Sequence, residues 1–119
     1  MGVHQALKTR AQYLSVYNSD RGWASSLVIM KAVPNGLNVT RIGFSVGKRI
    51  GKAVVRNRVR RLLREAVRTL NMKSGWDIVF IARKSAADAN YHEFRKAIGG
   101  LLKRACLLDE DEAIGVRAD

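Results

Sequence analysis

The sequence predicts a single α/β (α+β) domain, with the element order αββαβα around a small mixed sheet. Two observations support this fold class. Apolar residues recur with a helical period in two long segments, residues 52–70 and 90–108. Short apolar runs beside turn residues, typical of strands, occupy residues 25–33, 37–46 and 77–82. The length of 119 residues fits one domain, and a single proline with no internal repeat gives no sign of a linker.

The first half of the chain carries local signals for one helix and two strands. A capping box that begins at Thr9 predicts a short helix over residues 10–18. The continuous apolar run at residues 25–33 predicts a strand, and Pro-Asn-Gly at residues 34–36 supplies turn chemistry after it. Alternating side chains at residues 37–46 predict a return strand, antiparallel to the first.

The second half contains the most regular helix and the rest of the sheet. From residue 52 to residue 70 the apolar side chains form one stripe: Val55, Val59, Leu62, Leu63, Ala66 and Leu70. Residues 77–82 predict a buried strand, and Asn90 with Glu93 predicts the cap of a last helix. The apolar stripe of that helix is Phe94, Ile98, Leu101, Leu102, Ala105 and Leu108. Strand, helix and strand in succession allow a parallel pair joined by the long helix, with the last helix packed on the same sheet.

The chain is strongly basic, and its charge is concentrated in one segment. It contains 22 Lys and Arg against 10 Asp and Glu, a formal net charge of +12. Residues 41–68 hold ten basic residues and one acidic residue, which is +9 of that charge. Such a concentration on a folded domain indicates a polyanionic partner.

Composition and patterning exclude several classes of protein. The longest uncharged stretches, residues 22–30 among them, are too short to span a membrane, and residues 1–10 lack the apolar run of a signal peptide. A single cysteine, Cys106, excludes an internal disulfide and suits a cytoplasmic protein. We expect one domain over residues 1–119 with flexible ends at about residues 1–6 and 109–119, the latter a solvated acidic tail.

The arginine run at residues 56–64 is the strongest local signal for a partner. Like charges four residues apart on a helix cost about 0.2–0.5 kcal/mol per pair, so their repetition indicates a partner that reverses the repulsion. Arginine favours bidentate phosphate contacts and base stacking. A solvated face normally mixes signs, and a membrane-surface helix gives its apolar face to lipid, which this domain needs for its core. Nucleic acid is therefore the favoured partner, and charge alone does not separate RNA from DNA.

No other motif carries chemistry of its own. The glycine-rich residues 47–53 lack the spacing and the hydroxyl of a nucleotide-binding phosphate loop, so they predict a tight strand-to-helix turn. His4 and His92 are isolated and are expected at the surface, and Cys106 is expected in the core. We find no catalytic constellation and no metal-ligand spacing, so none of these residues predicts a catalytic or metal site.

The run from Arg41 to Arg61 resembles the signature of the bacterial ribonuclease P protein component. The hallmark is Arg56-Asn57-Arg58, and the wider match covers an N-terminal aromatic helix, a strand that ends in Arg83-Lys84 and a C-terminal helix, about residues 7–106 in all. The resemblance implies a two-layer α/β sandwich with a left-handed βαβ crossover, against the right-handed rule.

The resemblance also implies a function and its partners. An RNA subunit would hydrolyse precursor tRNA with magnesium and release the 5′ leader, so the protein would supply no catalytic residue and no metal cage. Its partners would be the catalytic RNA subunit and precursor tRNA, with no membrane and no obligate protein partner. The residues implied to bind the RNA subunit are Lys52, Arg56, Asn57, Arg58, Arg60, Arg61 and Arg64. Those implied to bind the leader, in a cleft between the sheet and the first helix, are Tyr13, Tyr17, Lys48, Arg49, Arg83 and Lys84.

Some positions leave alternatives open. The family usually has an acidic residue and phenylalanine where this chain has Gln12-Tyr13, serine is common at Gly47, and some members have an aromatic at Met30. By spacing alone, Tyr13 and Tyr17 are more typical of core packing, whereas the resemblance implies a leader-binding surface. A structural protein that binds RNA, such as a ribosomal component, explains the charge equally well.

Overall fold

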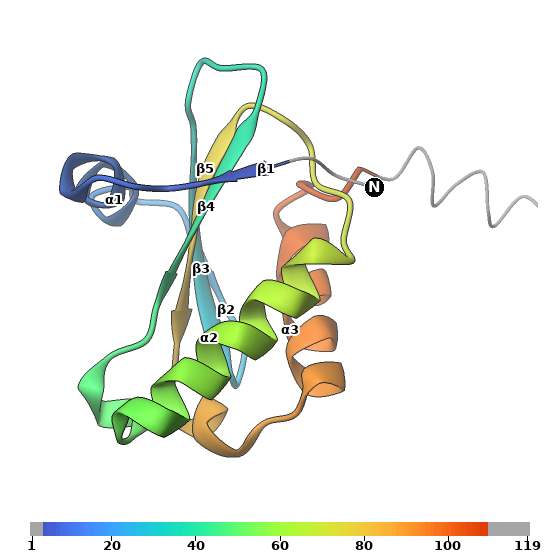
Figure 1. Cartoon of the computed structure of the whole chain (residues 1–119). Coiled ribbons are helices and arrows are strands. Elements are labelled where there is room, and N and C mark those ends of the chain that lie inside the picture. The colour runs from blue at the N-terminus through green and yellow to red at the C-terminus, as the bar shows by residue number, and fades with distance from the viewer. Residues whose placement is uncertain (1–3, 110–119) are drawn as a thin grey trace, which may run out of the picture.

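A five-stranded mixed sheet organises the computed structural model, which describes residues 4–109 (Figure 1). The strands, in the spatial order β1-β4-β5-β3-β2, are β1 (His4–Ala6), β2 (Gly22–Ala24), β3 (Val28–Pro34), β4 (Thr40–Ser45) and β5 (Trp76–Ala82). The helices are α1 (Arg10–Tyr17), α2 (Ala53–Arg68) and α3 (Tyr91–Arg104), with the 3-10 turns η1 (Lys48–Ile50) and η2 (Lys84–Asp88). All six predicted elements are present, and the α/β class is confirmed.

The pairing of the central strands confirms one prediction and corrects another. β4 and β5 are parallel neighbours joined by α2, as predicted. β3 and β4 run in opposite directions but do not pair, because β5 lies between them and is antiparallel to β3. β5 is buried from Asp77 to Phe80, on both of its faces, and its apolar run therefore occupies the centre of the sheet. The left-handed crossover stays a prediction from the resemblance.

Two edge strands were not predicted. β1 pairs in parallel with β4, so residues 4–6, expected within a flexible end, are ordered instead. β2 pairs with β3 through a turn in which the Ser25 hydroxyl accepts from the Val28 amide at 3.0 Å, which moves the start of β3 from residue 25 to residue 28. Strands of three residues give no periodic signal. The expectation for residues 110–119 lies outside the described residues.

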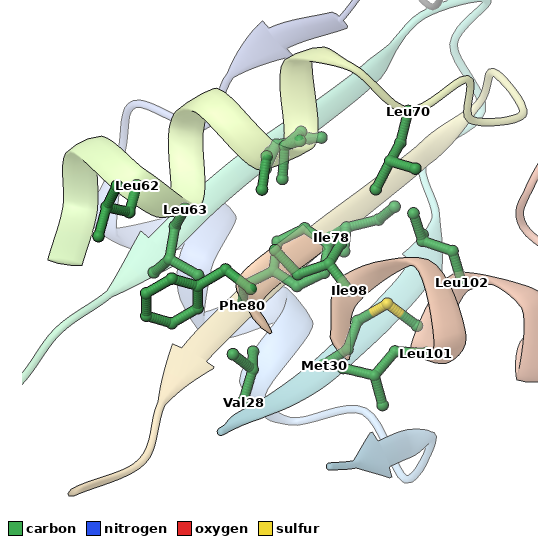
Figure 2. Packing of buried hydrophobic residues seen from close by; sticks show 14 of the residues in the cluster. Val28, Met30, Leu62, Leu63, Leu70, Ile78, Phe80, Ile98, Leu101 and Leu102 are labelled. Atoms are coloured by element: carbon green, nitrogen blue, oxygen red, sulfur yellow. The ribbon is translucent and has the colours of Figure 1, made fainter. Parts of the chain in front are cut away.

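α2 and α3 cover one face of the sheet and enclose the main core (Figures 1 and 2). Leu62 and Leu63 of α2 face Phe80 of β5, while Leu101 and Leu102 of α3 pack near Met30 of β3. The predicted stripes are confirmed, except that Val55, Ala105 and Leu108 are only half-buried. Val67, Met72 and Leu107 are also buried in this core.

Both predicted caps form, but the end of α3 corrects one prediction. Thr9 and Asn90 each make a complete capping box, with Gln12 and Glu93. After α3, the Leu107 amide donates to the Leu102 carbonyl at 2.8 Å, and the Cys106 amide to Lys103 at 3.1 Å. This is a Schellman ending, which places Cys106 at a φ of 60°. Cys106 is therefore exposed rather than in the core.

α1 lies alone on the opposite face of the sheet, over β3 and β5 (Figure 1). Its buried cluster is small: Leu7, Val16 and Val79, with Tyr13 and Tyr17 half-buried against them. Tyr13 lies directly on Gly43 of β4, because a Cβ at that glycine would be 2.5 Å from the Tyr13 ring. A glycine at this point of β4 is what allows α1 to approach the sheet.

The two predicted surface histidines differ from one another. His92 is exposed, as expected. His4 is half-buried, and burial together with the charge of Arg68 lowers its pKa. The prediction for His4 rested on its isolation from other metal-ligating residues in the sequence, which gives no information on burial, whereas β1 holds this residue against β4.

Candidate nucleic-acid interface

The helix α2 presents the cationic face that the sequence predicted. Lys52, Asn57, Arg61, Arg64 and Arg68 are exposed, on the side of α2 away from the core. Two other arginines are half-buried and locally held. The Arg56 Nε donates to the Gly51 carbonyl at 3.2 Å, and Arg60 donates to the Asn57 side-chain oxygen at 3.1 Å. Six of the seven residues predicted to bind the RNA subunit are thus exposed, or half-buried with bonds to the helix or to the residues before it: Lys52, Arg56, Asn57, Arg60, Arg61 and Arg64.

The seventh residue, Arg58, points elsewhere. It is half-buried, and its two terminal nitrogens donate to the carbonyls of Ala87 and Ala89, at 2.8 and 2.9 Å. These carbonyls belong to η2 and to the residue that follows it. Sequence spacing placed Arg58 beside the apolar stripe, but it could not show that backbone from a distant segment lies within reach.

A groove opens where the parallel strands β4 and β5 end. Its volume is about 700 Å³, and its walls come from the segments that contain η1 and η2. Apolar side chains from the ends of the strands provide its floor, and three cations, Arg49, Arg83 and Lys84, line it as well. The full lining is Ile29, Ser45, Gly47, Arg49, Ile50, Ile81, Ala82, Arg83 and Lys84. Apolar side chains flanked by cations suit a ligand with flat faces and a charged backbone.

The six residues predicted to bind the leader divide into two groups. Arg49, Arg83 and Lys84 line the groove, and exposed Lys48 is next to Arg49 in η1. Tyr13 and Tyr17 are not part of the lining and lie over the middle of the sheet, with their ring centroids 6.2 Å apart. Gly43, beneath Tyr13, and Ser45, in the groove, point to the same face of β4 because side chains alternate along a strand. The two tyrosines therefore continue the same face beyond the groove.

The departures from the family pattern have distinct structural settings. Gly47 has a φ of −77°, and a Cβ there would meet nothing within 4 Å, so a larger residue would fit. Gly51 has a φ of 154° and lies against Val55, which makes it the glycine required by the turn into α2. Met30 is fully buried in the main core, on the face of the sheet opposite the groove.

Arg41, counted among the basic residues of the charged segment, is neutralised inside the domain. Its guanidinium donates to both carboxylate oxygens of Asp77, at 2.8 and 2.6 Å, and Asn35 donates to the same carboxylate at 2.9 Å. Burial alone raises the pKa of Asp77, but the hydrogen bonds from Arg41 and Asn35 and the charge of Arg41 outweigh it and lower that pKa. This pair sits where β4 and β5 begin, at the end of the sheet away from the groove.

The described residues offer no protein site for metal chemistry. Within residues 4–109, no group of three or more His, Cys, Asp or Glu side chains is arranged to hold a metal ion.

No helix within residues 4–109 is both long enough and apolar enough to cross a membrane.

Comparisons with known proteins agree with this geometry. The family model for ribonuclease P matches residues 1–106. The ribonuclease P protein component of Caldanaerobacter subterraneus is 44% identical over 108 residues, which are 89% of this chain and 93% of the relative. That of Dehalococcoides mccartyi is 44% identical over 114 residues, 95% of each chain. The solved structure of the Staphylococcus aureus RNase P protein superposes with a TM-score of 0.78 at 25% identity, covering 90% of this chain and 100% of the other. The chain therefore belongs to the ribonuclease P protein family.

Proposed function

We propose that the chain binds the catalytic RNA subunit of ribonuclease P through α2 and the single-stranded 5′ leader of precursor tRNA through the groove. Family membership makes the chain a component of an endoribonuclease that acts in the maturation of the tRNA 5′ end. The observation that carries the finer proposal is that two separate cationic surfaces flank one segment, η1 and the start of α2. An RNA held by one surface lies next to an RNA held by the other.

The face of α2 is suited to the folded RNA subunit. Its exposed cations, Lys52, Arg61 and Arg64 among them, follow one side of a regular helix, and the opposite side is committed to the core. A row of arginines with fixed spacing matches phosphates that are themselves fixed, as in a folded RNA. The loss of repulsion among these arginines on binding adds to the affinity.

The groove is suited to a flexible strand. Ile29 and Ile81 offer an apolar surface to unpaired bases, while Arg49, Arg83 and Lys84 are placed for the phosphates. Such contacts depend little on base identity, since every base has a flat apolar face. The half-buried rings of Tyr13 and Tyr17 extend this surface along the sheet, so we place the far end of the leader there.

We assign the hydrolysis itself to the RNA subunit, with magnesium held by RNA. The protein contributes affinity and position, which raise the rate by keeping the substrate next to the reacting group. We propose that the protein acts with these RNA partners in the cytoplasm.

Reconstitution with the cognate RNA subunit tests the two surfaces separately. Lys84→Ala should weaken holoenzyme binding of precursor tRNA by about two- to tenfold and leave the affinity for mature tRNA unchanged, since only the precursor carries a leader. Arg61→Ala, on α2, should instead weaken binding of the RNA subunit. Equal weakening toward precursor and mature tRNA by Lys84→Ala would contradict the leader site and favour a general RNA-binding protein.

A further inference from the structure

The position of Arg58 between α2 and η2 distinguishes it from the other arginines of its helix. The guanidinium donates with separate nitrogens to the carbonyls of Ala87 and Ala89. A planar fork that holds two acceptors fixes their spacing, and it leaves fewer donors for a phosphate. Two other predicted RNA contacts on α2 form hydrogen bonds near the start of the helix. Arg56 donates to the Gly51 carbonyl, and Arg60 donates to Asn57 and to the Val46 carbonyl.

Arg58 bonds the end of a segment whose first residues line the groove. η2 begins at Lys84, and Arg83 and Lys84 supply two of the three cations that line the groove. Its first residues are held from the side of β3, where the Arg83 guanidinium donates to the Ser25 carbonyl at 3.0 Å and Ser85 to Ser26. Its end is held by the burial of Ala86 and Ala89 in the main core and by the two hydrogen bonds from Arg58.

The opposite wall is attached to the same helix. η1 ends at Ile50 and α2 begins at Ala53, so the wall that carries Arg49 is joined directly to the N-terminus of α2. α2 is thus connected to both segments, to η1 through the chain and to η2 through Arg58. Figure 1 shows the two segments, the green turn before α2 and the orange turn before α3, at the same end of the sheet.

We propose that Arg58 is a positioning residue that sets the separation of the groove walls and thereby the grip on the leader, rather than a contact to the RNA subunit. The inference rests on the proposed leader site. It makes the shape of the leader site depend on α2, the helix that docks on the RNA subunit. Arg58 acts through the η2 backbone. Its replacement should therefore change the preference for leader-bearing substrate more than it changes the affinity for the RNA subunit.

The test compares Arg58→Lys and Arg58→Ala with two matched arginine variants in the reconstituted holoenzyme. Lysine keeps the charge, but a single ammonium cannot bridge both carbonyls with the geometry of the fork. Arg61→Ala removes an exposed cation from α2, and Arg104→Ala removes a guanidinium bond to a carbonyl elsewhere, that of Ala24, at 2.8 Å. The measurements are affinity for the RNA subunit, the ratio of precursor to mature tRNA affinity, and hydrogen exchange of the Ala86 and Ala89 amides, which close η2.

We expect Arg58→Lys to lower the precursor-to-mature ratio by about two- to tenfold, the range that corresponds to one net hydrogen bond, and to speed exchange of both amides. Its affinity for the RNA subunit should fall less than that of Arg61→Ala, and Arg104→Ala should leave the ratio unchanged. If Arg58→Ala does not fold, Arg58→Lys carries the test.

An unchanged ratio in Arg58→Lys, with RNA-subunit affinity lost in Arg58→Ala as in Arg61→Ala, would make Arg58 an RNA contact and overturn the inference. The Lys84→Ala variant separates this failure from a failure of the leader site. If Lys84→Ala lowers the ratio and Arg58→Lys does not, only the role of Arg58 is wrong. If neither lowers it, the leader site and the role of Arg58 are both wrong.

Discussion

The two faces of the sheet differ in the side chains that pack on them and in how much apolar surface they bury. The face under α2 and α3 is a continuous apolar core, in which Phe80, Leu63 and Ile98 are fully buried. The face under α1 has a three-residue cluster, two half-buried tyrosines and the Arg41–Asp77 pair. Stability therefore resides mainly on the first face, and the second is left partly open. A binding surface requires an exposed face with aromatic rings, cations and a groove. The large core on the other face supplies the stability that allows this face to stay partly exposed.

The largest expected effect is on the α2–α3 face. Phe80→Ala should lower the free energy of unfolding by about 3–5 kcal/mol, through lost burial and a residual cavity. Val16→Ala, in the cluster under α1, should cost less, about 1–3 kcal/mol, although Val16 is equally buried. Chemical denaturation of both variants measures the difference. Equal losses would show that the two faces share the stability evenly.

Asp77 should make the α1 face sensitive to acid. The pKa of Asp77 is lowered in the folded protein, so its ionised carboxylate stabilises the fold. This contribution to the free energy of unfolding is complete above the ordinary carboxyl pKa and is lost as the pH falls through the pKa of the folded state. Stability should therefore drop below about pH 4, and Asp77→Asn should flatten that decline at a cost of about 1–3 kcal/mol near neutrality. Asp20→Asn, at an exposed carboxylate, is the control. If the stability of Asp77→Asn falls with acid as much as that of the wild type, the Arg41–Asp77 pair is not the cause of the acid sensitivity.

The contact of Tyr13 with Gly43 should be detectable as energetic coupling. Gly43→Ala places a Cβ about where the Tyr13 ring lies, 2.5 Å from its Cε1, and should destabilise the protein by about 1–3 kcal/mol. In a Tyr13→Ala background the same substitution should cost much less, because the ring is gone. Thermal melts of the four proteins complete the cycle. Additive effects would mean that α1 does not rest on β4 through this ring.

The smallest expected effect concerns the left-handed residue at the end of α3, on the face that carries the main core. Cys106 occupies a left-handed position at the end of α3, which costs a residue with a Cβ more than it costs glycine. Cys106→Gly should therefore raise stability by up to about 1 kcal/mol, and Leu107 should remain buried. A melt of the variant beside Ala105→Gly, at a right-handed position, distinguishes relief of strain from added flexibility. If Cys106→Gly and Ala105→Gly destabilise the protein equally, the backbone of Cys106 is not strained.

The sequence by itself determined the three helices, the strands β3, β4 and β5 and the cationic segment at residues 41–68, because these depend on neighbours along the chain. The capping boxes, the apolar stripes of α2 and α3 and the parallel β4–β5 pair all follow from local spacing. The arginine face of α2 follows from the same stripe, since whatever lies opposite a buried stripe is exposed.

Only the tertiary structure decided which distant groups meet. The position of β5 between β3 and β4, the rest of Tyr13 on Gly43, the Arg41–Asp77 pair and the grip of Arg58 on η2 each join segments far apart in the chain. Local patterns carry no information about such contacts, because a hydrogen bond or a ring contact depends on distances that form only when the sheet is assembled. The charge of Arg41 and Arg58 was evident from the sequence, but the fold turned both side chains inward.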